Sequence, residues 1–424
     1  MSESIPSCFV PAEILLPDFS AVCGTRWSVI ACDQYTSEPE YWEEAERIVG
    51  EAPSTLRLML PEIFLGESGD RVPRIHAAME AAIREQLVPQ PDAMIYLERT
   101  QSDGRVRRGL IGAVDLECYN YLPGSQSLIR ATEGTVLERI PPRVAVRRGA
   151  PLELPHVMLL VDDPGRTVIE PLTGLCRGEQ PLYDYDLMLG GGHVTGWLLP
   201  KAAQAAVPRA LAALVTPEAM QKKYGSAAHA PLLFAVGDGN HSLASAKAAY
   251  EEIRQRLREE AARRHPARYA LAEVVNLHDD ALDFEPIYRV VFGANPELLV
   301  RELEGALQSL HGAADAQTLT VVTEGGERVL TAPHPEQQLP VGTLQTFLDG
   351  FLRRYPEVRI DYIHGEEALR RLAAEPGAVG FLFEGMRKDE LFRTVLCDGA
   401  LPRKTFSMGH AQDKRYYLEC RKIR

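Results

Sequence analysis

The sequence predicts an α/β protein whose core is a mixed sheet. Apolar residues 232–236 form a short run that is typical of a buried strand, and the residues behind them carry apolar positions at helical spacing. Residues 94–98 and 105–119 are predicted strands, and the turn at residues 102–104 between them indicates an antiparallel hairpin. From residue 358 the pattern alternates strand, helix, strand, helix. A hairpin combined with such alternation predicts the mixed α+β class.

The first expected helix ends near Val49, because Ser37-Glu38-Pro39-Glu40 indicates a capping box with a proline in the first turn. The other expected elements, in chain order, are a helix at residues 72–87, the hairpin, a buried strand at residues 157–161, a strand that starts at residues 167–169, a helix at residues 201–223 with a break near residues 216–217, strands at residues 270–277 and 287–292, and a helix at residues 296–310.

The length of 424 residues predicts about two or three domains. The pattern of elements changes after Pro266, and we place a domain boundary there. Residues 1–265 are predicted to form a core domain that carries a phosphate-binding site. Residues 266–424 are predicted to form an α/β C-terminal region that contributes the loop around Lys404.

Charge and cysteine usage narrow the class of protein. The net charge is -13, from 46 basic and 59 acidic residues, and an acidic protein repels polyanions at long range. We therefore expect a small-molecule substrate, no nucleic acid and no membrane partner, while a homodimer stays open. Residues 1–10 lack the basic flank of a signal peptide, and no stretch has the roughly 20 apolar residues of a spanning helix. The seven scattered cysteines contain no Cys-x-x-Cys pair, so reduced thiols and a cytoplasmic location are expected.

The most informative segment is the predicted loop Gly237-Asp238-Gly239-Asn240-His241-Ser242, which joins a buried strand to a helix. Backbone amides and the positive end of the helix dipole converge at such a junction and favour phosphate. The two glycines let the backbone approach a ligand closely. Asp238 is a candidate Mg²⁺ ligand, and His241 can donate to a phosphate oxygen or shuttle a proton. The alternative is that Asp238 and Asn240 cap the helix and His241 lies on the surface.

A second candidate segment surrounds Glu133. A carboxylate near a phosphate site can act as general base toward a substrate hydroxyl, and small hydroxyl residues, Thr135 among them, flank this one. Arg130 can clamp an anion through its planar guanidinium. The alternative is a solvated turn with surface ion pairs.

Two further segments are candidates for the same site. Lys404 and Thr405 lie in a predicted loop near the chain end, where a Lys-Thr pair can neutralise phosphate charge. Asp33 and Tyr35 follow an apolar run that stops before a predicted helix, so Asp33 can point into a site at the strand end. Solvated loops and ordinary turn chemistry are the alternatives.

These segments resemble one known family, catalogued as domain of unknown function 1015. The family's Ala-Asp-Gly-His-His-Arg loop is matched at Asp238, Gly239 and His241, whereas Asn240 and Ser242 replace its first histidine and its arginine. Its His-Glu-Arg-Thr stretch is similar at Glu133 and Thr135. Its Met-Pro-x-Lys-Ser/Thr ending is similar at Pro402, Lys404 and Thr405, and its opening is similar at residues 29–35.

That family is more distantly similar to the ParB and sulfiredoxin superfamily, one branch of which phosphorylates free serine with an Asp-Gly-His-His-Arg loop and an upstream glutamate. The resemblance therefore implies a ParB/sulfiredoxin-like core and a phosphotransferase that links L-serine and O-phosphoserine, with Mg²⁺ and ATP or ADP. It implies catalytic roles for Glu133, Asp238, His241 and Lys404. It also implies cofactor contacts from Gly237, Gly239, Asn240, Ser242, Arg130, Thr135 and Thr405, and substrate contacts from Asp33 and Tyr35.

Two other functions stay open. A nucleotide-binding regulator without turnover is compatible with the superfamily and with the altered loop. A phosphatase or other hydrolase could use Asp238, His241 and a metal ion to activate water. Transfer to an added alcohol rather than to water would separate a kinase from a hydrolase.

Overall fold

The computed structural model describes residues 7–226 and 229–424, which form two compact units. Unit 1 consists of the described residues up to Ala131, of Thr135–Leu282 and of His410–Arg424. Unit 2 consists of Thr132–Gly134 and Asp283–Gly409. Residues 1–6, part of the stretch predicted not to be a signal peptide, and residues 227–228 lie outside the described residues.

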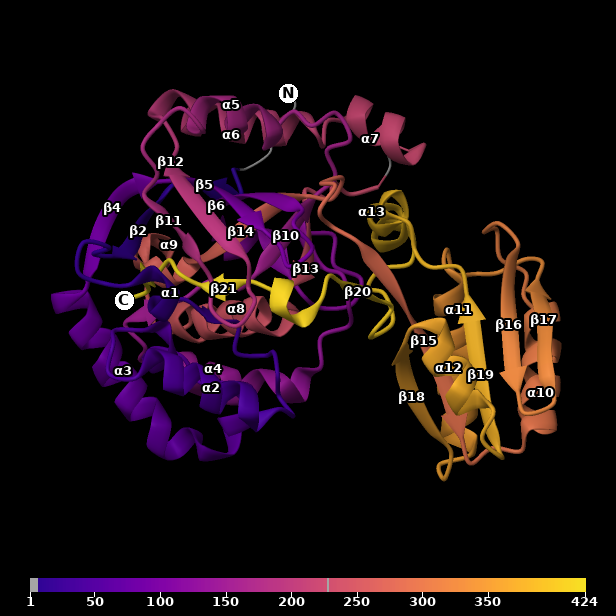
Figure 1. Cartoon of the computed structure of the whole chain (residues 1–424). Helices are drawn as coiled ribbons and strands as arrows, with labels where there is room; N and C mark the ends of the chain where they lie inside the picture. Colours follow the sequence, from indigo (N-terminus) through magenta and orange to yellow (C-terminus); the bar gives the residue numbers. More distant parts are fainter. Residues whose placement is uncertain (1–6, 227–228) are drawn as a thin grey trace. The chain divides into compact units, whose positions relative to one another are not determined.

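Within the described residues, unit 1 is built on a ten-stranded sheet (Figure 1). Its strands in spatial order are β11 (Tyr183–Asp186), β12 (His193–Leu198), β5 (Ile95–Thr100), β6 (Val106–Asp115), β14 (Tyr269–Asn276), β10 (Met158–Val161), β13 (Phe234–Asp238), β8 (Ile129–Ala131) and β7 (Tyr119–Asn120), with β1 (Phe9–Val10) paired to β6. β14 and β10, β13 and β8, and β8 and β7 pair in parallel, whereas the other neighbours are antiparallel. The predicted α/β class with a mixed sheet is confirmed, and so is the β5–β6 hairpin.

The helices of unit 1 are α1 (Gly24–Trp27), α2 (Pro39–Val49), α3 (Ser68–Glu85), α4 (Ile140–Arg147), α5 (Thr173–Cys176), α6 (Lys201–Ala213), α7 (Pro217–Tyr224), α8 (Asn240–Arg254) and α9 (Glu259–Arg264). The predicted helix that ends at Val49 is confirmed, but its capping box is wrong, because Glu38 is the N-cap residue and no side chain in the described part of the chain caps the helix. The predicted strand at residues 167–169 is also wrong, because these residues lie in bends and coil before a 3₁₀ turn.

Unit 2 has an antiparallel sheet of six strands within the described residues. Its strands are β17 (Gly326–Ala332), β16 (Gln317–Thr323), β19 (Ala378–Phe383), β15 (Phe284–Phe292) and β18 (Arg359–His364), with β20 (Phe406–Met408) paired to β15. Its helices are α10 (Pro296–Gln308), α11 (Pro340–Arg354), α12 (Glu366–Ala373) and α13 (Lys388–Cys397). The order β18, α12, β19, α13 confirms the alternation predicted from residue 358.

The division of the chain differs from the predicted boundary near Pro266. Strand β14 pairs with both β6 and β10 inside the sheet of unit 1, so the chain leaves this unit only after Leu282. The chain also returns, since His410–Arg424 belongs to unit 1. The yellow segment of Figure 1 that carries β21 (Tyr416–Tyr417) lies among the indigo and purple elements. A one-boundary division into residues 1–265 and 266–424 therefore does not describe the fold.

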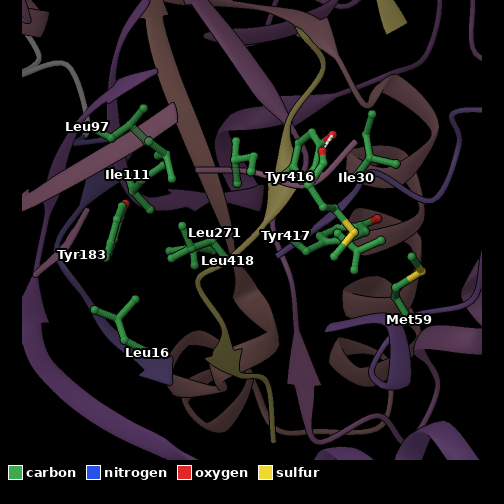
Figure 2. Packing of buried hydrophobic residues seen from close by; sticks show 14 of the residues in the cluster. Leu16, Ile30, Met59, Leu97, Ile111, Tyr183, Leu271, Tyr416, Tyr417 and Leu418 are labelled. Atoms are coloured by element: carbon green, nitrogen blue, oxygen red, sulfur yellow. Dashed lines mark hydrogen bonds between the residues drawn. The ribbon is translucent and has the colours of Figure 1, made fainter. Parts of the chain in front are cut away.

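Two short sheets attach this returning segment. Strand β21 pairs with β3 (Val29–Ile30), and β22 (Arg421–Lys422) pairs with β9 (Leu152–Glu153). Figure 2 shows Tyr416, Tyr417 and Leu418 packed among buried residues that come from much earlier in the chain. The returning segment at the end of the chain is therefore part of the core of unit 1.

A buried carboxylate fixes the same segment. The side chain of Glu273 is fully buried between Arg107 at 3.3 Å and Arg415 at 2.6 Å. A Cβ atom at Gly109 would stand 2.4 Å from its Oε1 atom, so the glycine leaves the space that the carboxylate fills. Burial opposes ionisation of Glu273, but the attraction of the two guanidinium groups outweighs it and holds the pKa below its usual range. The pair Arg415–Glu419 and the pair Arg421–Glu153 extend this set of buried charges.

Two cysteines differ from the prediction of reduced thiols, whereas the other five are free. Cys8 and Cys118 form a disulfide although they are 110 residues apart in the sequence. The pairing of β1 with the end of β6 brings them together, and cysteine spacing alone carries no sign of it. Among the described residues, none of the helices has the length and apolar character needed to cross a membrane.

We predict that Glu273→Gln lowers the free energy of unfolding by about 3–5 kcal/mol, because it removes the carboxylate that pairs with the buried Arg107 and leaves the buried Arg415 with Glu419 as its carboxylate partner. The pKa of Glu273 is depressed in the folded state. Its contribution is therefore fully present above the unfolded pKa of about 4.3 and is lost as the pH falls through the folded value. Urea unfolding at a series of pH values would measure both effects.

Glu260→Gln is the matched control, since Glu260 pairs with Arg264 in a fully solvated position. We expect it to leave the unfolding midpoint unchanged. Equal effects of the two substitutions would contradict the importance of the buried pair.

Candidate functional site

Most residues of the predicted loop belong to strand β13 or to helix α8. Strand β13 continues through Asp238 and helix α8 begins at Asn240, so Gly239 alone separates them. The expectation of six loop residues is therefore wrong. Gly239 adopts the left-handed conformation with φ +76°, and a Cβ atom there would lie 3.1 Å from the backbone of Val157. Only glycine fits this junction without strain.

The amino end of α8 presents backbone amides. Its first intrahelical hydrogen bond runs from the Leu243 amide to the Gly239 carbonyl over 3.0 Å, and no side chain of the described residues caps the helix. The amides that precede Leu243 point out of the first turn, where the helix dipole is positive. This arrangement favours a phosphate or another anion.

Asp238 lies beside a cation that the sequence analysis missed. Its Oδ1 atom accepts a hydrogen bond from the Gly239 amide at 2.9 Å, and its Oδ2 atom lies 3.4 Å from the Nζ atom of Lys414. Both side chains are largely buried. Lys414 therefore places a positive charge next to the amino end of α8.

His241 connects this turn with the segment around Thr135. The Nε2 atom of His241 accepts a hydrogen bond from the Val136 amide at 3.4 Å. The neighbouring Thr135 hydroxyl is buried and has no hydrogen-bond partner within the described part of the chain. A buried hydroxyl without a partner is costly unless a ligand satisfies it, so Thr135 fits the predicted ligand contact.

Ser242 meets a histidine that the sequence analysis also missed. The Nε2 atom of His156 lies 2.8 Å from the Ser242 hydroxyl, and its Nδ1 atom lies 2.9 Å from the Tyr417 hydroxyl. The Tyr417 hydroxyl also accepts from the Cys32 amide at 3.2 Å. Asp33, a predicted substrate residue, has its Oδ2 atom 3.9 Å from the Nε2 atom of His156. The structure thus brings Asp33 to the loop through His156.

A cavity of about 160 Å³ adjoins this group. Its polar side includes Cys32, His156, Ser242 and Tyr417, and aliphatic side chains line most of the rest. Burial raises the pKa of Cys32 and of Tyr417 above their usual ranges, so both side chains stay protonated.

Arg130 and Tyr35, two predicted ligand-contact residues of unit 1, make contacts with other parts of the chain. The Arg130 guanidinium donates to the carbonyls of Ser127, Ala230 and Pro231 at 2.9, 2.9 and 3.3 Å, and burial lowers its pKa. These bonds brace the chain before β13. The Tyr35 ring stacks on Tyr41 of helix α2 with 3.8 Å between ring centroids.

Within unit 2, the structure brings Glu133, Lys404 and Thr405 together. The Oε1 atom of Glu133 accepts from the Lys404 amide at 3.2 Å, and the Leu401 amide donates to the Thr132 carbonyl at 2.7 Å. The Lys404 ammonium lies 5.3 Å from the centre of the Tyr362 ring. The Thr405 side chain is buried, and its hydroxyl donates to the Pro402 carbonyl at 2.7 Å.

The buried guanidinium of Arg289 holds the turn at residues 403–404. Arg289 donates to the carbonyls of Lys404 and Arg403 at 2.9 and 3.1 Å. Burial lowers the pKa of Arg289 to about 10, and the charge of Glu133 acts in the opposite direction. The backbone of residues 403–404 is therefore fixed, while the Lys404 side chain is exposed.

The sequence does not reveal His156, Lys414 and Tyr417, because the pairing of distant segments places them at the site. His156 lies two residues before the start of β10, and β10 pairs antiparallel to β13 with Met158 opposite Asp238. A residue just before β10 must then lie beside the end of β13. The sequence predicts both strands but not their pairing. Lys414 and Tyr417 come from the segment that returns after unit 2, and no motif marks them.

No group of three or more His, Cys, Asp or Glu side chains that could hold a metal ion occurs among residues 7–226 and 229–424. The predicted Mg²⁺ ligand Asp238 is thus a single carboxylate. Mg²⁺ is commonly held by one or two carboxylates together with substrate phosphates and water, so this donor set fits an ion that arrives with a phosphate.

Comparisons with known proteins give a family match and distant structural likenesses. The family model described as "Protein of unknown function (DUF1015)" matches residues 18–351. A solved structure of free serine kinase in complex with AMP is 12% identical and covers 73% of this chain and 91% of its own, with a TM-score of 0.37. A C-terminally truncated SbnI from Staphylococcus aureus is 10% identical and covers 70% and 84%, with a TM-score of 0.33. A conserved hypothetical protein from Pyrococcus furiosus is 10% identical and covers 69% and 91%, also with a TM-score of 0.33. No curated protein matches the chain.

We predict that Gly239→Ala destabilises the protein by about 1–2 kcal/mol, because a left-handed conformation strains any residue with a Cβ atom. The close approach to Val157 adds to this cost. Gly69→Ala is the control, since Gly69 lies in the first turn of α3 with open space around it. Thermal unfolding should show a loss for the first variant and none for the second. A Gly239→Ala variant that unfolds at the wild-type temperature would contradict the left-handed conformation at this junction.

Proposed function

The chain belongs to the family described as protein of unknown function (DUF1015), and we propose that it is a phosphotransferase that binds phosphate at the amino end of α8. One observation carries the proposal. The first turn of α8 opens at Gly239 beside the Lys414 cation. The Thr135 hydroxyl, which has no hydrogen-bond partner among the described residues, lies next to Val136, whose amide binds His241. Amides, a cation and a donor hydroxyl together are the groups that a phosphate needs.

We propose a nucleotide as the phosphate donor and a small hydroxyl metabolite as the acceptor. The motif resemblance favours ATP or ADP as donor and free L-serine as acceptor, or O-phosphoserine in the reverse direction. The assignment of serine rests on family analogy, because a fold or a loop does not define a substrate.

The side chains of unit 1 have distinct proposed roles. Lys414 offsets phosphate charge. Because the Nε2 atom of His241 accepts from the Val136 amide, a neutral His241 carries its proton on Nδ1, where it can donate to a phosphate oxygen. Asp238 is the residue that would hold Mg²⁺, and the ion would supply further neutralisation of the transferring phosphoryl. Phosphoryl transfer depends mainly on positioning and charge neutralisation, so these roles are chemically sufficient for the phosphate side.

Glu133 and Lys404 belong to unit 2, and their proposed roles rest on the motif resemblance. Glu133 would act as base on the acceptor hydroxyl, and Lys404 would stabilise the transferring phosphoryl. Ligand contacts from Gly237, Asn240, Arg130, Thr405, Asp33 and Tyr35 remain predictions of the sequence, as do a homodimer and the cytoplasmic location.

One observation favours a second function, a nucleotide-binding regulator without turnover. The Asp238 carboxylate that would hold Mg²⁺ already lies 3.4 Å from Lys414. A cation in that place could bind the nucleotide phosphates without supporting transfer. Saturable nucleotide binding without any acceptor-dependent product would support this function.

We predict that phosphorus NMR will detect a new phosphomonoester when the protein is incubated with Mg²⁺, a donor and L-serine. ATP, ADP and pyrophosphate would be tested as donors, and O-phosphoserine with ADP would test the reverse reaction. Asp238→Asn and Glu133→Gln should each lower the rate by about 100-fold or more, the usual effect of losing a general base or a charge-stabilising group.

Asp70→Asn is the control for Asp238→Asn, because Asp70 lies exposed in the first turn of α3. It should keep the wild-type rate. If Asp238→Asn and Glu133→Gln both retained full activity, the proposed roles would be wrong. Phosphate release to water without a phosphomonoester would instead indicate a hydrolase.

A further inference from the structure

We propose that Ser242 is itself a phosphoryl acceptor and forms a transient phosphoserine with His156 as its base. The inference rests on the proposed phosphotransferase function and concerns the order of its steps. It makes Ser242 a nucleophile, whereas the family resemblance treats this position only as part of the phosphate-binding loop.

The position of the Ser242 hydroxyl suits a nucleophile. A serine hydroxyl is a weak nucleophile at neutral pH unless an adjacent base takes its proton. The Ser242 hydroxyl lies 2.8 Å from the Nε2 atom of His156, within the range needed for direct proton transfer. Because Ser242 lies in the first turn of α8, it also lies where the helix dipole favours an anion.

The orientation of His156 suits a general base. Its ring is buried, and its Nδ1 atom lies 2.9 Å from the Tyr417 hydroxyl. With Nδ1 protonated and donating to the Tyr417 oxygen, Nε2 is left as the acceptor that faces Ser242. Burial keeps Tyr417 protonated, so it orients the ring without removing its proton. This is the nucleophile, base and orienting group of serine enzymes, with a tyrosine in the third place.

The charge and the space around the Ser242–His156 pair also suit this step. Once His156 takes the proton it is a cation, and the Asp33 carboxylate 3.9 Å from its Nε2 atom offsets that charge. Ser242 and His156 both line the cavity of about 160 Å³, so the hydroxyl is not enclosed by protein atoms on every side.

The reaction balances in two displacements. In the first, the Ser242 oxygen forms a bond to phosphorus while the bond from phosphorus to the leaving nucleoside phosphate breaks, and the serine proton passes to Nε2 of His156. In the second, the acceptor hydroxyl oxygen bonds to phosphorus while the bond to Ser242 breaks. The proton on His156 returns to Ser242, and the acceptor's proton passes to Glu133, the proposed base, and from there to solvent, so the net reaction releases one proton.

The test is to incubate the full-length protein with Mg²⁺ and radiolabelled ATP, ADP or pyrophosphate without an acceptor, and to map the label by mass spectrometry of peptides. The expected result is one phosphoryl group on Ser242. Ser242→Ala should abolish the label, and His156→Gln should slow labelling by about 100-fold or more. Ser245→Ala is the matched control on the same helix, since its hydroxyl donates to the His241 carbonyl instead, and it should be labelled like the wild type.

A second readout separates this inference from the proposed function. Each in-line displacement inverts phosphorus, so two displacements predict overall retention of configuration with a chiral phosphate donor. Formation of phosphomonoester with inversion, or at the wild-type rate in Ser242→Ala, would overturn the phosphoserine step and leave the phosphotransferase intact. Labelled Ser242 without any phosphorylated acceptor would support the phosphoserine step and would exclude free L-serine as the acceptor. No label and no product with any donor would overturn both.

Discussion

The ion pairs of the buried Glu273 carboxylate are the interaction on which the arrangement of unit 1 depends. Desolvating a charge is expensive, and here Arg107 and Arg415 offset that cost from two different parts of the chain. Arg415 belongs to the segment that returns after unit 2, so the pairs fix residues 410–424 against the central strand β14. With that segment in place, Lys414 reaches Asp238 and Tyr417 reaches His156.

This constraint is consistent with the proposed phosphate site in an acidic protein. The net charge of -13 disfavours polyanions over the whole surface. At the amino end of α8, however, the helix dipole and the largely buried Lys414 act at short range. The electrostatic potential at this helix end is therefore positive although the net charge of the protein is negative. A small anion such as a nucleotide phosphate can use this local charge, whereas a nucleic acid would also meet the negative surface.

The sequence predicts what depends on local pattern. The α/β class, the β5–β6 hairpin, α2, α10 and the junction of β13 with α8 all follow from apolar spacing and turn residues. The sequence does not reveal features that depend on strand order. The β10–β13 pairing places His156 beside Ser242, the position of β14 moves the boundary past Pro266, and β1 brings Cys8 to Cys118. These contacts join residues that are far apart in the chain, and a single sequence records no pairing between them.

A crystal structure of the protein with ADP and Mg²⁺ tests the central claim most directly, because it shows where the phosphates bind. We predict phosphate oxygens at the first turn of α8, within hydrogen-bond distance of the Ser242 amide and the Thr135 hydroxyl and close to Lys414. Phosphates bound elsewhere, with the Thr135 hydroxyl still without a partner and the Lys414–Asp238 pair unchanged, would contradict it.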